Sequence, residues 1–590
     1  MRGIDSFLYL HGASHRVCNS TRLAITNLSP KAAPKGRTDL HSSVLSILCV
    51  LACLLPFSNK AFHIDDPLFV WTGQHIAKHP FDPYGFRIVW YDTEMPMSEI
   101  TKNPPLASYY GALVGGLGGW SERALHLGFL LPAIGVVLGT QRLARRFTKY
   151  PVLAAVITLL TPGFLVSSSS LMCDTMMLAL WVFSVIYWLE GLDSGKQIYL
   201  LACALLIAAC ALTKYFGAAL IPLLLAYSLF KKRRFGIWVC YLFVPVVILL
   251  GYQYVTHALY GRGLLSDAAQ FANLHNHVQG VSIKSKALIG LAFAGGCVFP
   301  VIAFGSFLWS RRQIMAALIF SSAVGLALAM RWLPIRAPAA SAAYTHWHLV
   351  SGEMAFYIIG GISIFGLIVA DGRRGPDCDW GVLSLWIVGT FLFACFVNWT
   401  INVRSILPMI PAVAILIARR LEAANITCRR HLFTRTAIAL LVSGILSMWV
   451  AWGDAALANS GRTAARLVQY KTRNAPTPVY FEGHWGFQYY MEEFHALPVD
   501  LSKAFHAGDI LVIPENNANI FGPPSGFTPS GTAIEIKLNS HLTTMSPPLG
   551  AGFYASAWGP LPFAVGSVEP DRYRLYELAP LENGLPAAAK

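Results

Sequence analysis

The sequence predicts an all-α protein that crosses a membrane many times and ends in a small soluble α/β domain. Of its 590 residues, 55% are hydrophobic and only 13% are charged, whereas a soluble globular protein carries about 25% charged residues. Apolar runs of roughly 17–25 residues, the length that crosses a bilayer core, recur along the chain. Short basic loops separate many of these runs, as expected of a polytopic membrane protein.

The segment 1–42 is polar and basic and contains no apolar core of a signal peptide, so we expect a cytoplasmic tail. The segment 43–453 is expected to form the transmembrane domain, with about thirteen helices. The predicted spans lie near 43–58, 122–141, 151–169, 174–190, 197–213, 216–230, 236–257, 286–309, 313–330, 354–370, 381–398, 404–418 and 434–452.

The formal net charge of +15 is concentrated in the loops between spans. Basic residues are enriched in cytoplasmic loops, so the charge indicates topology and does not indicate a nucleic-acid partner. The loops that we place in the cytoplasm are RLARRFTK (142–149), KKRRF (231–235), RR (311–312), GRR (372–374) and ARR (418–420) with CRR (428–430). With thirteen spans, the N-terminus is then inside and the C-terminus outside. The eleven cysteines lie mostly in apolar runs and form no disulfide or metal-binding pattern.

Residues 59–121 are expected to form one long first outer loop. Within it, PPLASYYGALVGGLGGW (104–120) is apolar but short and rich in glycine and proline. Counting this stretch as a span would move the basic loop at 142–149 to the outside, against the charge rule. We therefore expect a re-entrant or interfacial helix.

From residue 454 the composition changes to mixed polarity, with glycine and proline turns between short strand-like runs. GDILVIPENN (508–517) and RYRLYELAP (572–580) are typical of this region. We expect 454–590 to be a soluble α/β domain on the outer side of the membrane.

Ionisable residues at membrane depth are costly and are functional candidates by default. In the predicted topology, six of them gather at the outer ends of spans, where both acidic and basic groups share one face. A cluster of acidic and basic side chains on one face is suited to binding a phosphorylated substrate that is held in the membrane. The six are Asp65, Asp66, Lys102, Asp174, Lys214 and Arg404.

Each of these residues also has a purely structural interpretation. Asp66 stands directly before Pro67, which is typical of a helix N-cap followed by proline at the first helical position. Asp174 could cap the next helix in the same way. Lys214 could extend its ammonium to the interface, and Arg404 could anchor a helix end there. The adjacent Asp65, in AFHIDDPLFVW (61–71), has no comparable structural role and is the strongest candidate.

A divalent metal is compatible with such a site, but the sequence does not indicate one. The pairs in HNH (275–277) and HWH (346–348) lack further ligands at a set spacing, so we interpret them as interfacial or solvent-facing histidines. No glycine-rich nucleotide-binding loop is present.

Five segments in order resemble family 39 glycosyltransferases, the group of the protein O-mannosyltransferases and aminoarabinose transferases. They are HIDDPLFVWTGQHI (63–76), KNPPLASYYGAL (102–113), SLMCDTMMLALWVFSVIYW (170–188), ACALTKYFGAALIPLLL (209–225) and NVRSILPMIPAVAIL (402–416). The resemblance implies a GT-C membrane fold. It also implies transfer of a sugar, with inversion, from a polyprenyl-phosphate carrier to a lipid, glycan or protein acceptor at the outer face.

The resemblance implies that Asp65 is the general base and that Lys214 and Arg404 hold the donor phosphate. This assignment fits the chemistry, because an acceptor needs its proton removed and the departing phosphate gains negative charge. Asp66 stands where the family usually has glutamate, which leaves it a possible site-shaping residue. Asp174 matches a family position and is the second site-shaping candidate.

Two further positions depart from the family pattern. Asn103 replaces a family histidine, so we expect the adjacent Lys102 to supply the charge at the phosphate. Ser405 replaces a family tyrosine after Arg404. Because of these departures, one alternative stays open: the protein is a catalytically degenerate member of the family that acts as an assembly partner. A lipid or oligosaccharide transporter is the other alternative, although transporters show mid-membrane charges or internal repeats that are not evident here.

The expected partners are therefore the polyprenyl-phosphate sugar donor, an acceptor and membrane lipids, with no nucleic acid. No cofactor is firmly implied. The resemblance to the aminoarabinose transferases suggests the bacterial inner membrane, with the N-terminus in the cytoplasm and the C-terminal domain in the periplasm.

Overall fold

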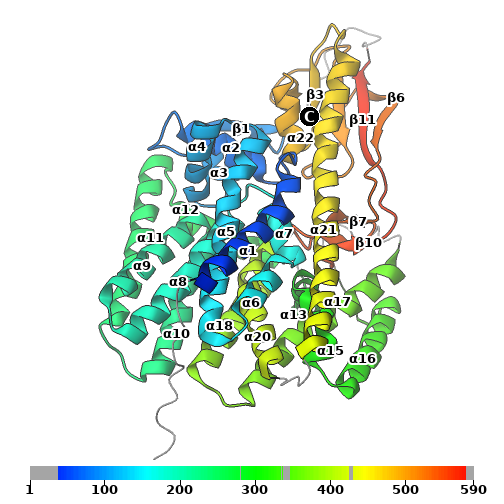
Figure 1. Ribbon diagram of the computed structural model, residues 1–590. Coiled ribbons are helices and arrows are strands. Elements are labelled where there is room, and N and C mark those ends of the chain that lie inside the picture. Colours follow the sequence, from blue (N-terminus) through cyan, green and yellow to red (C-terminus); the bar gives the residue numbers. More distant parts are fainter. Residues whose placement is uncertain (1–36, 279–280, 334, 336–345, 424–428, 580–590) are drawn as a thin grey trace, which may run out of the picture. The chain divides into compact units, whose positions relative to one another are not determined.

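The computed structural model describes residues 37–278, 281–333, 335, 346–423 and 429–579 (Figure 1). Most of the predicted tail, 1–42, therefore lies outside the described residues. The chain divides into two compact units, Met1–Leu45 and Ser46–Lys590. The first unit contains the start of helix α1 (Arg37–Leu54), and the second contains the rest of α1 and the other elements.

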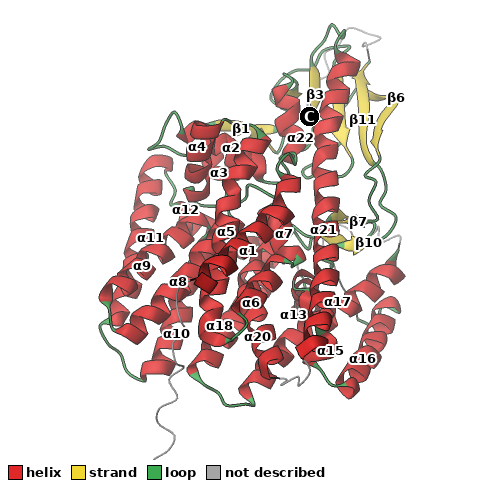
Figure 2. Cartoon of the chain, in the orientation of Figure 1, coloured by secondary structure: helices red, strands yellow, loops and turns green. Residues whose placement is uncertain are grey.

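The predicted fold class is confirmed, because the described residues are mainly helical with a small C-terminal sheet region (Figure 2). Eight helices in this part of the chain are long and apolar enough to cross a membrane, which makes this an integral membrane protein. They are α1 with its extension to Phe57, α5 (Glu122–Phe147), α8 (Asp174–Ser194), α11 (Trp238–Tyr260), α16 (Arg311–Ala329), α17 (Trp347–Gly372), α18 (Cys378–Leu392) with its π-helical end to Val397, and α21 (Arg429–Thr472).

The other predicted spans fall on helices that are short or broken. Prolines account for several breaks, because a proline lacks the backbone N–H that continues a helix. α6 (Pro151–Leu159) and α7 (Pro162–Ser168) are bent by 66° and together could make a ninth span. The rest are α9 (Gln197–Thr213), α10 (Leu220–Lys232), α13 (Ile283–Cys297), α14 (Pro300–Ala303), α15 (Gly305–Leu308), α19 (Val403–Ile406) and α20 (Ile410–Ala423). The count of thirteen stays a prediction.

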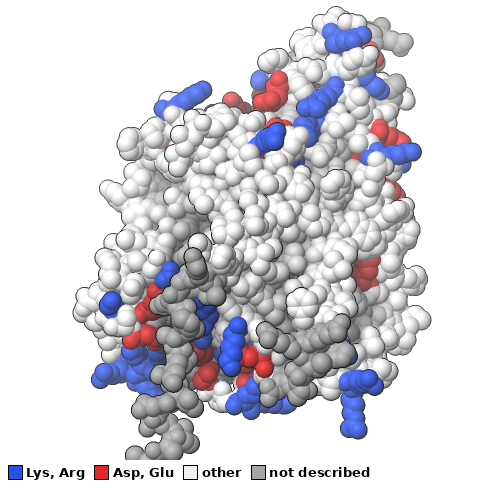
Figure 3. All heavy atoms as spheres, in the orientation of Figure 1, with Lys and Arg blue, Asp and Glu red and all other residues white. Residues whose placement is uncertain are grey.

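The charged side chains support the membrane assignment. On the face drawn in Figure 3, most lysine, arginine, aspartate and glutamate residues gather toward the two ends of the helices, and a broad belt between the ends is largely uncharged. Uncharged side chains are what a bilayer core tolerates.

The predicted first outer loop forms a layer of short elements at one end of the helices (Figure 1). It contains α2 (Asp66–Ile76), the antiparallel hairpin of β1 (Arg87–Trp90) and β2 (Thr93–Pro96), α3 (Met97–Ile100) and α4 (Leu106–Gly118). The expected re-entrant or interfacial stretch corresponds to α4, which packs on α2. α12 (Leu264–Val278) follows α11.

The C-terminal region contains a five-stranded mixed sheet with strand order β4-β3-β5-β11-β6. β3 pairs in parallel with β4 and β5, whereas β11 pairs antiparallel with β5 and β6. The strands are β3 (Val479–Phe481), β4 (Leu497–Pro498), β5 (Ile510–Pro514), β6 (Phe527–Ile536) and β11 (Asp571–Leu578), and α22 (Trp485–Glu493) connects β3 to β4. Two short antiparallel pairs lie outside this sheet, β7 (Leu542–Thr543) with β10 (Ala564–Val565) and β8 (Met545–Ser546) with β9 (Ala551–Gly552), and β7 contacts α21.

Helix α21 links the two regions. It continues through the predicted boundary at residue 454 and ends at Thr472. Asp454 accounts for the early boundary, because its polarity marks the end of the apolar run, yet the residue is fully buried inside the helix. The division into 43–453 and 454–590 stays a prediction, and the sheet begins at Val479.

Candidate functional site

The two adjacent aspartates at the start of α2 have different surroundings. Asp66 is fully buried, and its carboxylate accepts hydrogen bonds from the backbone N–H of His63 at 3.0 Å and of Leu171 at 2.8 Å. The prediction that Asp66 is the N-cap is wrong by one residue, because the helix begins at Asp66 and Asp65 occupies the N-cap position without a side-chain cap. Asp66 therefore ties the outer loop to the segment before α8.

The burial of Asp66 has an electrostatic consequence. Desolvation raises the pKa of its carboxyl to about 7, although the charge of Lys60 and the two backbone N–H groups oppose the shift. Because this carboxyl group is fully buried and already accepts two backbone hydrogen bonds, its role is structural. It leaves Asp65 as the accessible member of the pair.

Asp65 pairs with Arg404 across the chain. Its Oδ2 accepts a hydrogen bond from Arg404 Nη1 at 2.9 Å, and the side chains remain 28% and 14% exposed. Arg404 also approaches the sulfur of Met172 and lies over the ring of Tyr554, 5.8 Å from its centroid. Its buried Nε has no hydrogen-bond partner among the described residues. The predicted base and a predicted phosphate ligand therefore lie together.

Asp174 and Lys214 form a second ion pair, with Asp174 Oδ1 and Lys214 Nζ 2.5 Å apart. Asp174 is the first residue of α8 and nearly fully buried, and Lys214 lies in the break between α9 and the short 3₁₀ turn that follows it. The prediction that Asp174 caps its helix is wrong, since Cys173 occupies the N-cap position and Asp174 pairs with Lys214 instead.

The two ion pairs lie around Cys173. Burial raises the pKa of the Cys173 thiol to about 12, and the charges that act on it are those of Asp174, Lys214, Arg404 and Asp65. Four of the six predicted residues thus form one polar cluster, which we call the outer cluster. It contains two carboxylates and two cations, so an added phosphate would find both cations already held in place.

Lys102 lies beside the outer cluster, and no contact joins it to the cluster among the described residues. Its ammonium pairs with Asp267 of α12 at 2.6 Å and donates to the carbonyl of Glu99. The next residue, Asn103, makes the connection, because its side-chain oxygen lies 3.7 Å from the sulfur of Cys173. The loop therefore brings Lys102 near the cluster through Asn103.

Two cavities flank this region. An apolar cavity of about 310 Å³ lies between the first outer loop and helices α9 and α11, lined by Pro80, Phe81, Pro83, Pro105, Leu106, Tyr109, Leu212, Tyr252, Val255, Thr256, Leu259 and Tyr260. The hydroxyl of Tyr252 lies 3.2 Å from that of Tyr215, the residue after Lys214. The cavity therefore lies near the end of α9, where Leu212 lines it two residues before Lys214.

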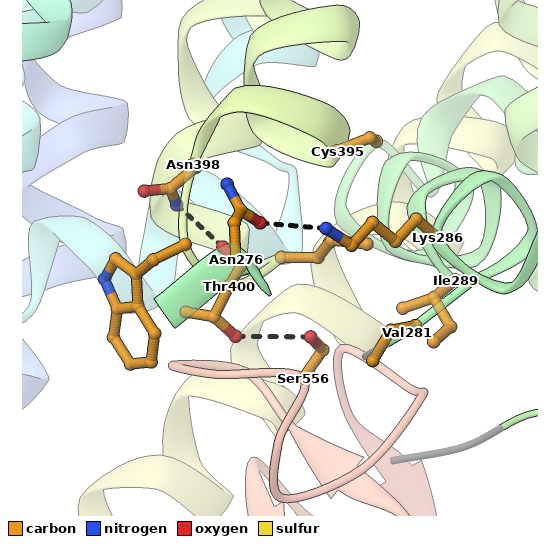
Figure 4. Close-up of a pocket in the computed structure, with 10 residues that line it drawn as sticks. Asn276, Val281, Lys286, Ile289, Cys395, Asn398, Thr400 and Ser556 are labelled. Atoms are coloured by element: carbon orange, nitrogen blue, oxygen red, sulfur yellow. Dashed lines mark hydrogen bonds between the residues drawn. The ribbon is translucent and has the colours of Figure 1, made fainter. Parts of the chain in front are cut away.

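A second, smaller cavity is lined partly by residues 398–401, the segment that leads into Arg404 (Figure 4). Lys286 projects toward its lining and donates a hydrogen bond to Asn276 at 2.8 Å. Thr400 and Ser556 share a hydroxyl hydrogen bond of 3.2 Å, and Asn398 donates to the Thr400 carbonyl at 2.7 Å. Ser556 shows that the C-terminal region contributes to this wall.

Sequence reasoning missed a buried ion pair next to the cluster. Lys60 and Asp454 are both fully buried and lie 2.6 Å apart, and Asp454 also accepts from the hydroxyls of Thr544 and Tyr554. Asp454 offered a signal, since an acid directly after an apolar run and within a continuing helix requires a partner. Among the described residues, no group of three or more His, Cys, Asp or Glu side chains lies together as metal ligands would.

The fold and the outer cluster define a helical integral membrane protein with paired carboxylates and cations at the junction of broken helices and an outer loop. Residues 102–255 match the family model of dolichyl-phosphate-mannose-protein mannosyltransferases. This match confirms the predicted resemblance to a family of membrane glycosyltransferases. The matched range contains Lys102, Asp174 and Lys214, whereas Asp65 and Arg404 lie on either side of it.

The chain is also similar to solved structures. ArnT from Cupriavidus metallidurans bound to undecaprenyl phosphate is 15% identical, with a TM-score of 0.41, and the similarity covers 81% of this chain and 93% of that chain. The oligosaccharyltransferase of Archaeoglobus fulgidus tethered with an acceptor peptide is 14% identical, with a TM-score of 0.47 and coverage of 79% and 64%. Arabinosyltransferase EmbB from Mycobacterium smegmatis is 14% identical, with a TM-score of 0.33 and coverage of 85% and 48%. Among curated protein sequences, no significant match was found.

Proposed function

We propose that the protein is a membrane glycosyltransferase that transfers a sugar from a polyprenyl-phosphate-linked donor to a lipid, glycan or protein acceptor at the outer face, with inversion. The observation that carries the proposal is the ion pair of Asp65 with Arg404, 2.9 Å long and partly exposed, beside the pair of Asp174 with Lys214. The family match over residues 102–255 supports the glycosyltransferase class.

Asp65 acts as the general base in this proposal. A hydroxyl or amine acceptor becomes a good nucleophile when a carboxylate removes its proton as it attacks the anomeric carbon. In the structure, Arg404 donates a hydrogen bond to one of the two carboxylate oxygens of Asp65 and so occupies it. The donor phosphate competes for Arg404, so donor binding frees Asp65 to accept the proton. Base activation therefore requires a bound donor.

The cations stabilise the departing lipid phosphate. Arginine can grip two phosphate oxygens with its planar fork, whereas lysine supplies a point charge. The buried Nε of Arg404 has no hydrogen-bond partner within the described part of the chain, which suits this use. Lys214 supplies the second cation through its pair with Asp174, and Lys102 assists from the loop next to Asn103. Charge that develops on the phosphate in the transition state then meets preorganised cations.

The site-shaping residues hold this arrangement. Asp174 fixes the ammonium of Lys214, and Asp66 fixes the loop that carries Asp65. The adjoining apolar cavity of about 310 Å³ supports a polyprenyl chain as the part of the donor that lies beside the cations. We place the protein in the bacterial inner membrane, with the N-terminus in the cytoplasm and the C-terminal region in the periplasm.

The test is a transfer assay with the purified protein, radiolabelled polyprenyl-phosphate sugars and membrane extracts as acceptor. We expect wild type to transfer label and Asp65→Asn to lose roughly 10²–10⁴-fold in rate, the usual contribution of a general base. Glu190→Gln is the matched control, because Glu190 pairs with Arg142 at a partly exposed site away from the outer cluster. Equal transfer by wild type and Asp65→Asn would reject the assignment of the base.

The same assay separates the alternatives. A transporter would move labelled lipid across a vesicle membrane without forming a glycosylated product. A degenerate assembly partner would bind the donor and form no product in the presence of any membrane extract. Either result would reject the glycosyltransferase proposal.

A further inference from the structure

The C-terminal region contacts the segment that leads into Arg404. The backbone N–H of Val403 donates to the carbonyl of Phe553 at 3.0 Å, and that of Ser556 donates to the carbonyl of Ile401 at 2.8 Å. The hydroxyls of Thr400 and Ser556 add a third contact at 3.2 Å (Figure 4). Two segments that are far apart in sequence, 156 positions at the contact of Thr400 with Ser556, thus hold one another directly before the predicted phosphate ligand.

Tyr554 lies in the centre of this contact and is 4% exposed. The guanidinium of Arg404 lies over its ring at 5.8 Å, which is within the range of a cation–π interaction. On another side, the ring packs edge-to-face on His63 at 5.6 Å. A ring face attracts the guanidinium without occupying its N–H groups, so these groups remain available to oxygen ligands.

The hydroxyl of Tyr554 is fixed at the other end of the ring. It donates to Asp454, with both carboxylate oxygens 3.0 Å away. Asp454 is held in turn by Lys60 at 2.6 Å and by the hydroxyl of Thr544 at 2.7 Å. Lys60 and Asp454 are fully buried, so neither can leave its partner without exposing an uncompensated charge to an apolar interior. The ring under Arg404 is thereby anchored to α21 and to the first outer loop.

We propose that Tyr554 is a positioning residue for the donor phosphate, which makes the C-terminal region part of the donor site. This inference rests on the proposed function. The ring orients the guanidinium of Arg404 when the donor phosphate replaces Asp65 as its partner. Without the ring, Arg404 loses the contact on the face of its guanidinium that fixes the direction of its N–H groups.

The experiment measures the dissociation constant of the purified full-length protein for undecaprenyl monophosphate, together with the kinetic constants of transfer. Tyr554→Leu is expected to weaken binding about 30-fold, the equivalent of a desolvated cation–π interaction of about 2 kcal/mol. Tyr554→Phe keeps the ring and is expected to restore binding to within about threefold of wild type. At saturating donor, the rate of Tyr554→Leu stays close to that of wild type, because the residue acts through binding of the donor.

Two further comparisons separate positioning from a general structural effect. Tyr576→Leu, in the half-buried face of β11, is the matched control and is expected to bind like wild type. In an Arg404→Gln background, Tyr554→Leu is expected to have no further effect, since the group that it positions is gone. If Tyr554→Leu does not fold, Tyr554→Met carries the same expectation, because its unbranched side chain adapts to irregular gaps and also lacks the ring face.

The inference is overturned if Tyr554→Leu binds like wild type, or if it weakens binding equally with and without Arg404. Its failure is distinguishable from failure of the proposed function. If wild type does not bind undecaprenyl monophosphate at all, the donor assignment falls and this inference falls with it. If wild type binds and Tyr554→Leu is indistinguishable from it, only the role of Tyr554 is rejected.

Discussion

At the scale of single residues, two neighbouring carboxylates differ because of what surrounds them. Asp66 is enclosed and accepts two backbone N–H groups, whereas Asp65 remains partly exposed and pairs with Arg404. The sequence indicates that Asp65 lacks a structural role, since Pro67 accounts only for the helix start. It could not predict the partner, because Arg404 is 339 positions away and no local pattern encodes that contact.

The burial of His63 predicts a pH-dependent stability. Desolvation lowers the pKa of His63 to about 4, and the charge of Lys60 lowers it further, against the raising effect of Asp454 and Asp65. Between pH 4 and 6.5, the unfolded chain carries the proton and the folded chain does not, so stability is lost as the pH falls through this window. The loss amounts to about 3 kcal/mol when the shift is complete.

Asp66 contributes with the opposite sign, because its raised pKa favours the folded state at low pH. The measurement is therefore the difference in stability between wild type and His63→Gln, obtained from thermal unfolding in detergent at each pH from 7 to 4. We expect wild type to lose stability relative to the variant as the pH falls. Parallel pH profiles would show that His63 does not titrate as a buried neutral imidazole.

At the scale of elements, the outer loop and the C-terminal region are held together by close packing of α22. Gly486, the second residue of that helix, lies so near Phe62 that an added Cβ would be 1.8 Å from the Phe62 carbonyl oxygen. The stretch GHWGFQYYMEE (483–493) is thus a buried packing surface. The aromatic residues of this stretch favour a buried core, but no local pattern predicts that the core packs against the outer loop at Phe62.

Gly486→Ala is therefore expected to destabilise the fold by roughly 1–3 kcal/mol, the usual cost of overpacking. Thermal unfolding of the purified variant measures the effect. Gly389→Ala, in α18, is the matched control, because its added methyl group meets nothing within 4 Å, and a helical glycine-to-alanine change is neutral or stabilising. If the two variants were equally stable, the contact between α22 and the loop would not be tight.

The helix breaks were predictable only in part. Apolar runs predicted the positions of the long helices well, because length and hydropathy are local properties. The 66° bend between α6 and α7 and the continuation of α21 through Asp454 depend on tertiary partners. Lys60 neutralises Asp454 from 394 positions away, so an acid that looks like the end of a span lies within a helix.

At the scale of the whole molecule, the distribution of basic loops predicts which ends face the cytoplasm. Arg234, in an exposed basic loop, is expected inside, and Lys537, exposed after β6, is expected outside. In a background without the native cysteines, a membrane-impermeant maleimide should label Lys537→Cys in spheroplasts and label Arg234→Cys only after permeabilisation. The reverse pattern would invert the topology.

For the whole molecule, the central proposal is that Asp65 performs proton transfer while Arg404 holds the donor, although the two side chains pair with each other in the structure. The most direct test measures donor affinity and the rate at saturating donor for Asp65→Asn and Arg404→Gln. We predict that Asp65→Asn keeps donor binding and loses the rate by roughly 10²–10⁴-fold, whereas Arg404→Gln loses donor binding and also rate, because Arg404 both holds the donor phosphate and stabilises its developing charge. Full activity of Asp65→Asn at saturating donor, or the same profile for both variants, would contradict the account.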